Sequence, residues 1–271
     1  MKLFIEIRET ISVIFKNRNI MTTLVISDFR SRYLNSFIGL PWAFIQPAMY
    51  VLVIWFAFTY GLRAGNTDSG FPFGAWLIVG TIPWLFISQT MIVSCMAINE
   101  YAYLIKKTRF PVSLIPIIKI FSGMIVHFSI IVCVGLLLMF SYNIPPTIYW
   151  IQIIYYLFAT TVLLTGISLF VASVNVFIKD MAHIINIIVT MLFWATPIIW
   201  PYKMLEGSYR YVALFNPFFY ITEGYRYTFL EQRWFYEFPE MNLFFWTITA
   251  LFLIIGVLTF QKLRPTFGDE L

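Results

Sequence analysis

The segment NEYAYLIKKTRFPVS, residues 99–113, separates two long apolar runs of the chain. Its charged residues are Glu100, Lys106, Lys107 and Arg109, and Phe110-Pro111 follows them. Charges at this density belong in water or at a lipid surface, not in hydrocarbon. We interpret the segment as an interfacial helix on the cytoplasmic face, offered to a partner that moves it. The alternative is a basic loop that only fixes topology, since positively charged cytoplasmic loops are common.

Most of the remaining sequence is apolar. Of the 271 residues, 60% are hydrophobic and only 11% are charged. A soluble domain of this length could not bury so much apolar surface, so we expect lipid to cover part of it. The net charge of +5 is spread along the chain, which favours topology signals over a nucleic-acid interface. Cys95 and Cys133 lie inside apolar runs, and each is expected to be a small buried hydrophobe rather than half of a disulfide.

The N-terminal residues 1–19 combine apolar and charged side chains. Acidic residues and the lack of a small-residue cleavage site distinguish them from a signal peptide. Leu3, Ile7, Ile11 and Ile14 recur at helical spacing, with charged residues between them. This pattern predicts an amphipathic helix that lies on the membrane surface, within a cytoplasmic N-terminal region of residues 1–35.

Six apolar runs are interpreted as transmembrane helices, because roughly 20 residues cross a bilayer. They are Phe37–Tyr60, Phe71–Ile98, Val112–Tyr142, Ile148–Val176, Ile184–Trp200 and Met241–Gln261. We therefore predict an all-α transmembrane domain over residues 36–262, followed by a cytoplasmic tail, 263–271. Six spans put both termini on one side. That side receives 13 of the 18 Lys and Arg residues, which predicts a multi-pass plasma-membrane protein with cytoplasmic termini.

The predicted extracellular segment 201–240 is unusually aromatic, with 14 Phe, Tyr and Trp residues. A solvated loop would not be so apolar, so we predict a pair of re-entrant helices between spans five and six. Such irregular backbone is tolerated only where protein or water covers it. Glu223 and Arg226 are three residues apart and can pair on one helix face. The alternative is a surface helix in the outer headgroup layer, with both charges in extracellular water.

The sequence contains neither the phosphate-binding motif of ATPases nor a cluster of metal-binding residues. No glycine precedes a lysine, which excludes the phosphate-binding loop of ATPases. The two histidines, His127 and His183, are too few for a metal cluster. We expect His127 to hydrogen-bond a neighbouring helix, with a proton-relay role as the alternative. Lys119 is expected to snorkel toward the cytoplasmic headgroups, and its alternative role is an entry-site cation that attracts phosphate.

Several stretches of the sequence resemble the ABC-2 permeases that export lipid-linked polymers. They are SFIGLPWAFIQPAMYVLVIWFAFTYGLR, GFPFGAWLIVGTIPWLFISQ, FPVSLIPI, FNPFFYITEGYRYTFLEQRWFY and QKLRPTFGDEL, in this order from about Leu34 onward. Within these permeases the chain resembles the teichoic acid translocation permeases of Gram-positive bacteria. The GLR at Arg63, the NPFFYITEGYR stretch and the acidic tail carry that narrower resemblance, whereas O-antigen and capsule exporters share the general layout.

The resemblance implies two permease copies, each bound to a separate subunit that holds ATP and Mg²⁺, so no cofactor is expected in this chain. Residues 99–112 would be the coupling helix, and Phe110 and the Tyr103-Leu104 face are expected to fill a groove of the ATPase. The implied coupling residues are Glu100, Tyr103, Leu104, Lys106, Lys107, Arg109, Phe110, Lys179 and Asp180. Channels of this superfamily are often lined by aromatics, so the channel or gate candidates are Trp42, Phe44, Tyr50, Trp55, Lys119, Glu223 and Arg226.

Two classes of function are compatible with these observations. The leading hypothesis is a permease subunit that moves lipid-linked teichoic acid, a polyol-phosphate polymer, out of the cell, with an O-antigen or capsular polysaccharide exporter as the alternative. The competing class is a membrane-embedded glycan transferase. It would need acidic residues gathered at one membrane face, and the acids of segment 201–240 alternate with Lys and Arg as in an ion-paired rim.

Overall fold

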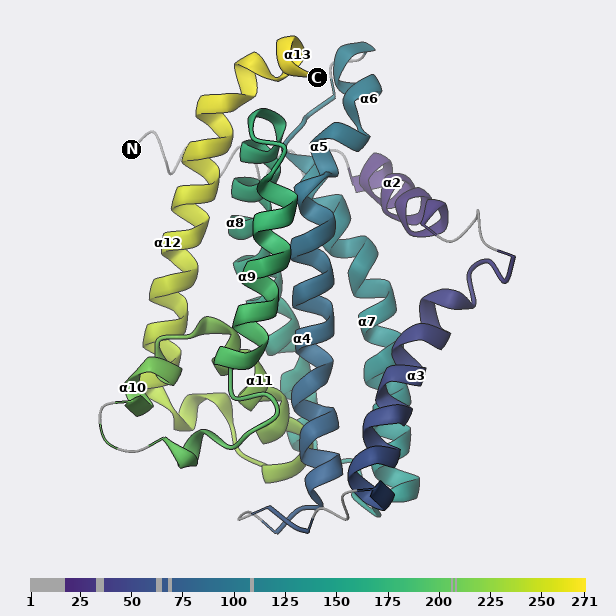
Figure 1. The fold of residues 1–271 in the computed structure, drawn as a ribbon, viewed down its shortest axis with the longest axis vertical. Helices are drawn as coiled ribbons and strands as arrows, with labels where there is room; N and C mark the ends of the chain where they lie inside the picture. The colour runs from purple at the N-terminus through teal and green to yellow at the C-terminus, as the bar shows by residue number, and fades with distance from the viewer. Residues whose placement is uncertain are drawn as a thin grey trace.

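The structure is a computed structural model that describes residues 18–32, 37–61, 65–67, 70–107, 110–205, 207 and 209–271. The predicted amphipathic helix before residue 18 lies outside the described residues, as do Arg63 and Arg109. The α-helices, labelled as in Figure 1, are α2 Arg18–Ser31, α3 Trp42–Phe56, α4 Phe73–Cys95, α5 Ala97–Glu100, α6 Ala102–Lys107, α7 Leu114–Ser141, α8 Ile153–Phe177, α9 Met181–Ala195, α10 Tyr209–Leu214, α11 Pro217–Arg226, α12 Pro239–Leu263 and α13 Phe267–Glu270.

The described part of the chain is helical, without β-strands, apart from one bridge between Asn66 and Pro72. The predicted all-α class is confirmed. Each predicted span overlaps one apolar helix: α3, α4, α7, α8, α9 or α12, of which α8, α9 and α12 extend beyond the predicted bounds. Four of these are long and apolar enough to cross a membrane, whereas α3 and α9 have 15 residues each. The count of six spans therefore stays a prediction.

The helices pack most closely where α8 meets α12. A Cβ at Gly256 would lie 2.1 Å from the carbonyl oxygen of Gly166, and a Cβ at Gly166 would lie 2.6 Å from the backbone of α12. Small residues let the two backbones approach this closely. The approach adds van der Waals contacts, which hold helices together in lipid because the hydrophobic effect does not. The main core cluster then extends over α4, α7, α8 and α11. α4 lies at its centre, with α9 on one side and α3 on the other (Figure 1).

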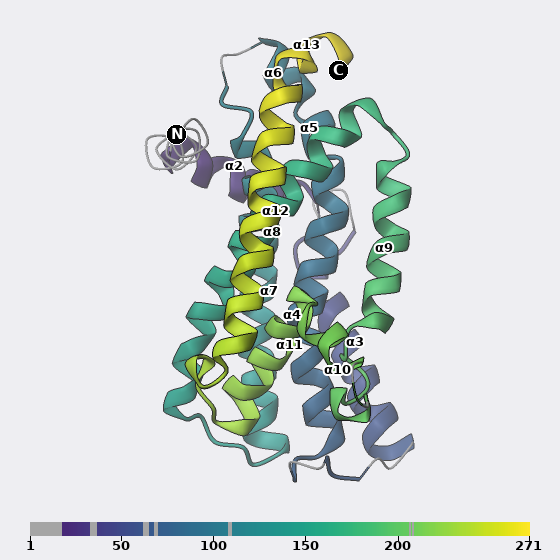
Figure 2. The same ribbon diagram turned by 90° about the vertical axis from the view of Figure 1, so that its left-hand side faces the viewer.

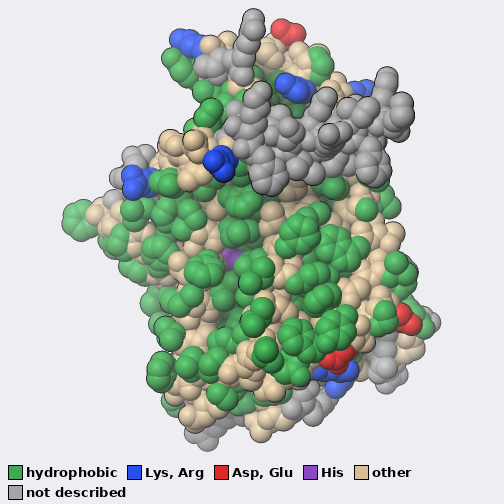
Figure 3. All heavy atoms as spheres, turned by 180° about the vertical axis from the view of Figure 1, so that it is seen from behind, with side chains coloured by type: hydrophobic (Ala, Val, Ile, Leu, Met, Phe, Trp, Pro, Cys, Tyr) green, Lys and Arg blue, Asp and Glu red, His purple; other side chains and the backbone are tan. Residues whose placement is uncertain are grey.

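The two ends of the bundle differ. Helices α2, α6 and α13 gather at one end, and α10 and α11 lie toward the other (Figure 1). Figure 2 shows α2 projecting from the bundle on the side opposite α9. Hydrophobic side chains cover the middle of the rear face, with Lys and Arg concentrated toward the α6 end (Figure 3). This arrangement agrees with the predicted cytoplasmic placement of residues 99–113, and the orientation itself stays a prediction.

The aromatic segment after α9 folds back into the bundle. Asn216 caps α11 by accepting a hydrogen bond from the Phe218 N–H, and Pro217 occupies the first turn. Every residue of α11 is buried, and the π-helical turn Tyr227–Glu231 continues it. The alternative of a helix on the protein surface is wrong for α11, because α4, α8 and α12 cover it. Its depth in the membrane as a re-entrant helix stays a prediction.

Candidate functional site

The charged segment of residues 99–113 includes the end of α5 and the short helix α6, at one end of the bundle (Figure 1). Tyr103 on α6 is 71% exposed, and the Lys107 ammonium lies 4.5 Å from the centre of its ring. Lys106 is exposed as well, whereas Leu104 is half-buried. An exposed aromatic ring flanked by cations is a surface suited to a protein partner, because aromatics fill pockets and the charges remain at the rim.

A buried ion-pair cluster attaches this segment to the bundle. Lys119 on α7 is 3% exposed, and its ammonium donates to Oδ1 of Asp28 at 2.5 Å and to the carboxylate of Glu100. Asp28 lies on α2 and also accepts two hydrogen bonds from Arg32, at 2.7 and 3.1 Å. The cluster thus joins three elements: α2, α5 and α7. The prediction that Lys119 snorkels to the headgroups is wrong, because two carboxylates hold its ammonium inside the protein.

The charges of the cluster balance. Burial alone raises the pKa of the Asp28 carboxyl, but Arg32, Lys119 and Ser122 outweigh burial and lower this pKa below its usual value. The Tyr101 ring, 5.5 Å from the Lys119 ammonium, covers the cluster, and burial beside the two carboxylates raises the pKa of its hydroxyl. Asp28 is therefore ionised at neutral pH. The Lys119 ammonium, already shared by two anions, is poorly placed as the phosphate-attracting entry site considered above.

Phe110 contacts the chain's own apolar side chains, and its role as an anchor for the partner stays a prediction. Its side chain is half-buried and packs against two of the chain's own apolar clusters. One of these clusters includes Met21 of α2, and the other includes the buried Phe267 of α13. Phe110 therefore attaches the end of the charged segment to α2 and α13. The residues left for a partner are Tyr103, Lys106 and Lys107, together with the exposed turn Lys179-Asp180 between α8 and α9.

Glu223 and Arg226 form a second buried ion pair, at the opposite end from α6. Arg226 is fully buried and donates to Oε1 of Glu223 at 2.7 Å, as their three-residue spacing predicts. It also donates to the carbonyls of Pro197 and Ile198, at 2.9 and 2.6 Å. Its guanidinium stacks 3.4 Å from the centre of the Trp76 ring. The extracellular-water alternative for these two charges is wrong, and their role at an outer gate stays a prediction.

The guanidinium of Arg226 can lie against α4 because residue 80 is a glycine. A Cβ at Gly80 would lie 2.3 Å from Nη2 of Arg226. Arg226 thereby ties α11 to α4 and to the turn after α9. A planar guanidinium satisfies several acceptors at once, and a lysine could not replace it.

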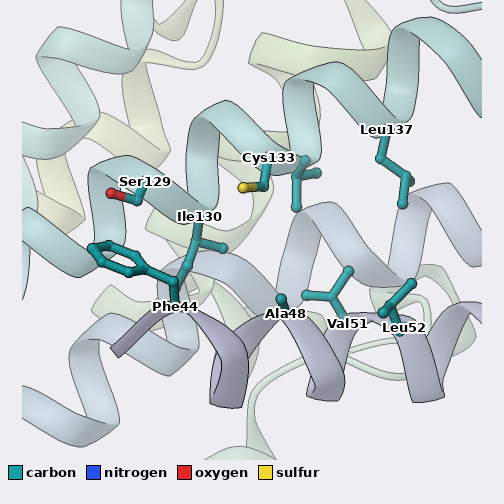
Figure 4. Close-up of a pocket in the computed structure, with 9 residues that line it drawn as sticks. Phe44, Ala48, Val51, Leu52, Ser129, Ile130, Cys133 and Leu137 are labelled. Atoms are coloured by element: carbon teal, nitrogen blue, oxygen red, sulfur yellow. The ribbon is translucent and has the colours of Figure 1, made fainter. Parts of the chain in front are cut away.

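The four aromatic channel candidates on α3 do not share one face. Phe44 points toward α7 and lines an apolar gap of about 180 Å³ with Ser129, Ile130 and Cys133 (Figure 4). Tyr50 lines a separate cavity between α3, α4 and α7. Trp55 is half-buried and packs edge-on against Tyr60. Trp42 is exposed. The structure therefore does not bring the four together, and each stays a channel candidate on its own.

His127 makes the interhelical hydrogen bond expected of it. Its Nε2 lies 2.7 Å from the hydroxyl of Tyr225 on α11, and its ring stacks on Phe86. Both cysteines are free, Cys95 buried and Cys133 exposed, so the expected burial of Cys133 is wrong.

The sequence analysis did not identify Asp28 as a site residue. The sequence feature that could have identified Asp28 is its position four residues before Arg32 in the predicted N-terminal helix region, because this spacing pairs charges on a helix.

Comparison with known proteins places these features in context. The family described as ABC-2 type transporter matches residues 20–230, more than half of the chain. An O-antigen export system permease protein of Myxococcus xanthus is 26% identical over 95% of this chain and 97% of its own. One from Klebsiella pneumoniae is 24% identical over 93% of this chain and 95% of its own. The polysialic acid transport protein of Escherichia coli is 24% identical over 74% of this chain and 77% of its own.

Proposed function

Because the chain belongs to the ABC-2 type transporter family, we propose that it is the membrane-embedded permease subunit of a polysaccharide exporter. A separate ATP-hydrolysing subunit drives it and binds ATP and Mg²⁺, since this sequence has no phosphate-binding loop. Two copies of each subunit form the complex in the plasma membrane. The chain itself carries out no covalent chemistry.

The single observation that carries this proposal is the exposed surface of α6. Tyr103, Lys106 and Lys107 project at the end of a bundle of apolar helices, on α6, which directly follows the helix α5 that the ion-pair cluster joins to α7 and α2. A partner that pushes on this surface acts on the bundle through α5 and its ion pair with Lys119. The Lys179-Asp180 turn lies at the same end and extends the docking surface.

The substrate we favour is a lipid-linked polysaccharide of the O-antigen or capsule class. Relatives that cover nearly the whole chain carry the name of O-antigen export permeases, and a further one is named for polysialic acid transport. This preference reverses the order of substrates expected from the sequence. A teichoic acid polymer is the second candidate, supported by the NPFFYITEGYR stretch and the acidic tail. In that case the source is a Gram-positive bacterium.

The test is deletion of the chain's gene in its own cell, followed by analysis of the polymer. We expect lipid-linked polymer to accumulate on the cytoplasmic side and to disappear from the surface, with both restored by the intact gene. The repeat unit of the accumulated polymer, sugars or polyol phosphates, decides between the two substrates. Unchanged surface polymer would contradict both.

A further inference from the structure

A cavity of about 460 Å³ lies between α3, α4 and α7, within one copy of the chain. Apolar side chains form much of its wall, including Met49, Val53, Leu85 and Ile130. Its polar side chains are Arg32, Gln46, Tyr50, Gln89, Thr90 and His127. No carboxylate lines this cavity among the described residues. A pocket with apolar walls and a few polar groups is the usual form of a small-molecule site.

The imidazole of His127 supplies the second observation. It is 1% exposed and lines the cavity, and its Nε2 is used by Tyr225. Its Nδ1 is buried and has no hydrogen-bond partner among the described residues. A buried polar atom without a partner is unfavourable, so the site favours a ligand that supplies one.

The chemistry of Nδ1 narrows the choice of ligand. If Nε2 donates to Tyr225, Nδ1 is an acceptor, and if Nε2 accepts, Nδ1 carries the proton and donates. A hydroxyl group satisfies either form, because it both donates and accepts. The amide groups of Gln46 and Gln89 likewise offer both functions. These neutral groups match a hydroxyl-rich ligand better than an anion.

The backbone of α3 adds a further acceptor. Pro47 lies inside this helix and has no N–H, so the carbonyl of Ala43 loses its usual helical partner. Ala43 and Pro47 both line the cavity. The stacked rings of Phe86 and His127, with centroids 4.6 Å apart, provide an apolar platform beside these groups. Polar groups beside an aromatic face complement the hydroxyls and C–H faces of a pyranose ring.

We propose that this cavity binds a sugar residue at the lipid end of the glycan, with the lipid chain along the apolar wall. The proposal rests on the polysaccharide export function above and assigns a recognition site to it. Arg32 lies at the α2 edge of the cavity and is already paired with Asp28, so the cavity selects its ligand through hydroxyl groups and shape rather than charge.

The experiment uses the full chain in complex with its ATPase subunit, in lipid nanodiscs. The probe is a decyl β-glucoside with a photoreactive group on the alkyl chain, and its matched control is the same chain on phosphocholine. We expect the glucoside to label peptides of α3 and α7 at least about fivefold more than the phosphocholine probe, the ratio that one hydrogen bond supplies. Equal labelling by the two probes would overturn the proposal, since the cavity would then accept any alkyl chain.

Two pairs of variants locate the recognition. Val126→Trp fills the cavity and should abolish the labelling, whereas Val132→Trp, on the exposed face of α7, should retain it. His127→Phe removes Nδ1 and should remove the preference for the glucoside. Tyr225→Phe breaks the same interhelical hydrogen bond but keeps Nδ1, so it should retain the preference. Loss of preference in Tyr225→Phe as well would show a packing effect and overturn the assignment to Nδ1.

Competition identifies the source of the sugar. Lipid-linked polymer extracted from the producing cell should displace the probe, and a bilayer glycolipid such as diglucosyl diacylglycerol should not. The reverse order would overturn the substrate assignment. Export by the Val126→Trp variant is measured in parallel. Normal export with the cavity filled would overturn this inference and leave the exporter function standing, whereas failure of the wild-type chain to export any polymer would refute the function itself.

Discussion

The ammonium of Lys119 lies 2.5 Å from Oδ1 of Asp28, across 91 residues of sequence, and it also donates to Glu100. One buried cation therefore joins the bundle helix α7 to the surface helix α2 and to α5 of the charged segment. We expect these three elements to move as a unit. A displacement of α6 by the partner would then reach α2 and α7 together.

Lys119→Met should detach this junction. Removing Lys119 takes a charged hydrogen-bond donor from the buried Asp28 carboxylate, which costs about 1–3 kcal/mol, because Arg32 still pairs with Asp28 and Glu100 is half exposed. We expect a lower midpoint of thermal unfolding in detergent and easier proteolysis of α2. The double variant Lys119→Met/Asp28→Asn should recover part of the loss. As a control, Glu237→Gln breaks the exposed pair with Arg233 and should cost less than about 1 kcal/mol. Equal losses in both variants would contradict a structural role for the cluster.

Acid should open the same junction. The pKa of Asp28 in the folded chain is lower than the ordinary aspartate pKa of 3.8, so its carboxylate stabilises the folded state fully above pH 3.8. This contribution is lost as the pH falls from 3.8 through the lower pKa of the folded chain. The difference in unfolding midpoint between the wild type and Asp28→Asn should therefore narrow on acidification below 3.8. A difference that stays constant through this range would show that the ionised carboxylate is not what stabilises α2.

Tyr103 is expected to anchor the ATPase subunit. Tyr103→Ala should weaken the complex by about 2 kcal/mol, or roughly 30-fold in affinity, as for a buried aromatic at an interface. Lys107→Ala should weaken it less, because a rim charge stays solvated. Affinity is measured between the purified permease and ATPase subunits. Phe110→Ala is the contrasting variant and should lower the stability of the permease alone. A larger loss of affinity from Lys107→Ala than from Tyr103→Ala would mean that charge alone holds the segment.

Arg226→Lys should be strongly destabilising, by about 3 kcal/mol or more, because lysine cannot reach the two carbonyls and the carboxylate together. Glu223→Gln should cost less, since the guanidinium keeps its carbonyl partners. The double variant Glu223→Gln/Arg226→Gln should recover part of the loss of Arg226→Gln. Assembly is measured as folded protein in the membrane fraction. Additive effects of the two changes would contradict a coupled buried pair.

Much of the fold could be predicted from the sequence. Apolar runs bounded by charges mark helices, and the apolar helices overlap the predicted ranges to within a few residues at most ends. The pairing of Glu223 with Arg226 could be predicted from helical spacing, because the two residues are close in sequence. The direction of the Lys119 side chain could not be predicted, because its two partners come from distant segments. The same reason explains Phe110: an aromatic residue beside a basic segment is equally suited to a partner's groove or to the chain's own clusters, and only the tertiary contacts decide.

The most direct test of the central claim is ATP-dependent transport by a reconstituted complex. The permease and its ATPase subunit are placed in liposomes with lipid-linked polymer, and polymer that reaches the opposite leaflet is measured by enzymatic accessibility. We expect transfer only when both subunits and hydrolysable ATP are present, with no ATP hydrolysis by the permease alone. Transfer by the permease without the ATPase subunit, or hydrolysis of ATP by the purified permease, would contradict this expectation.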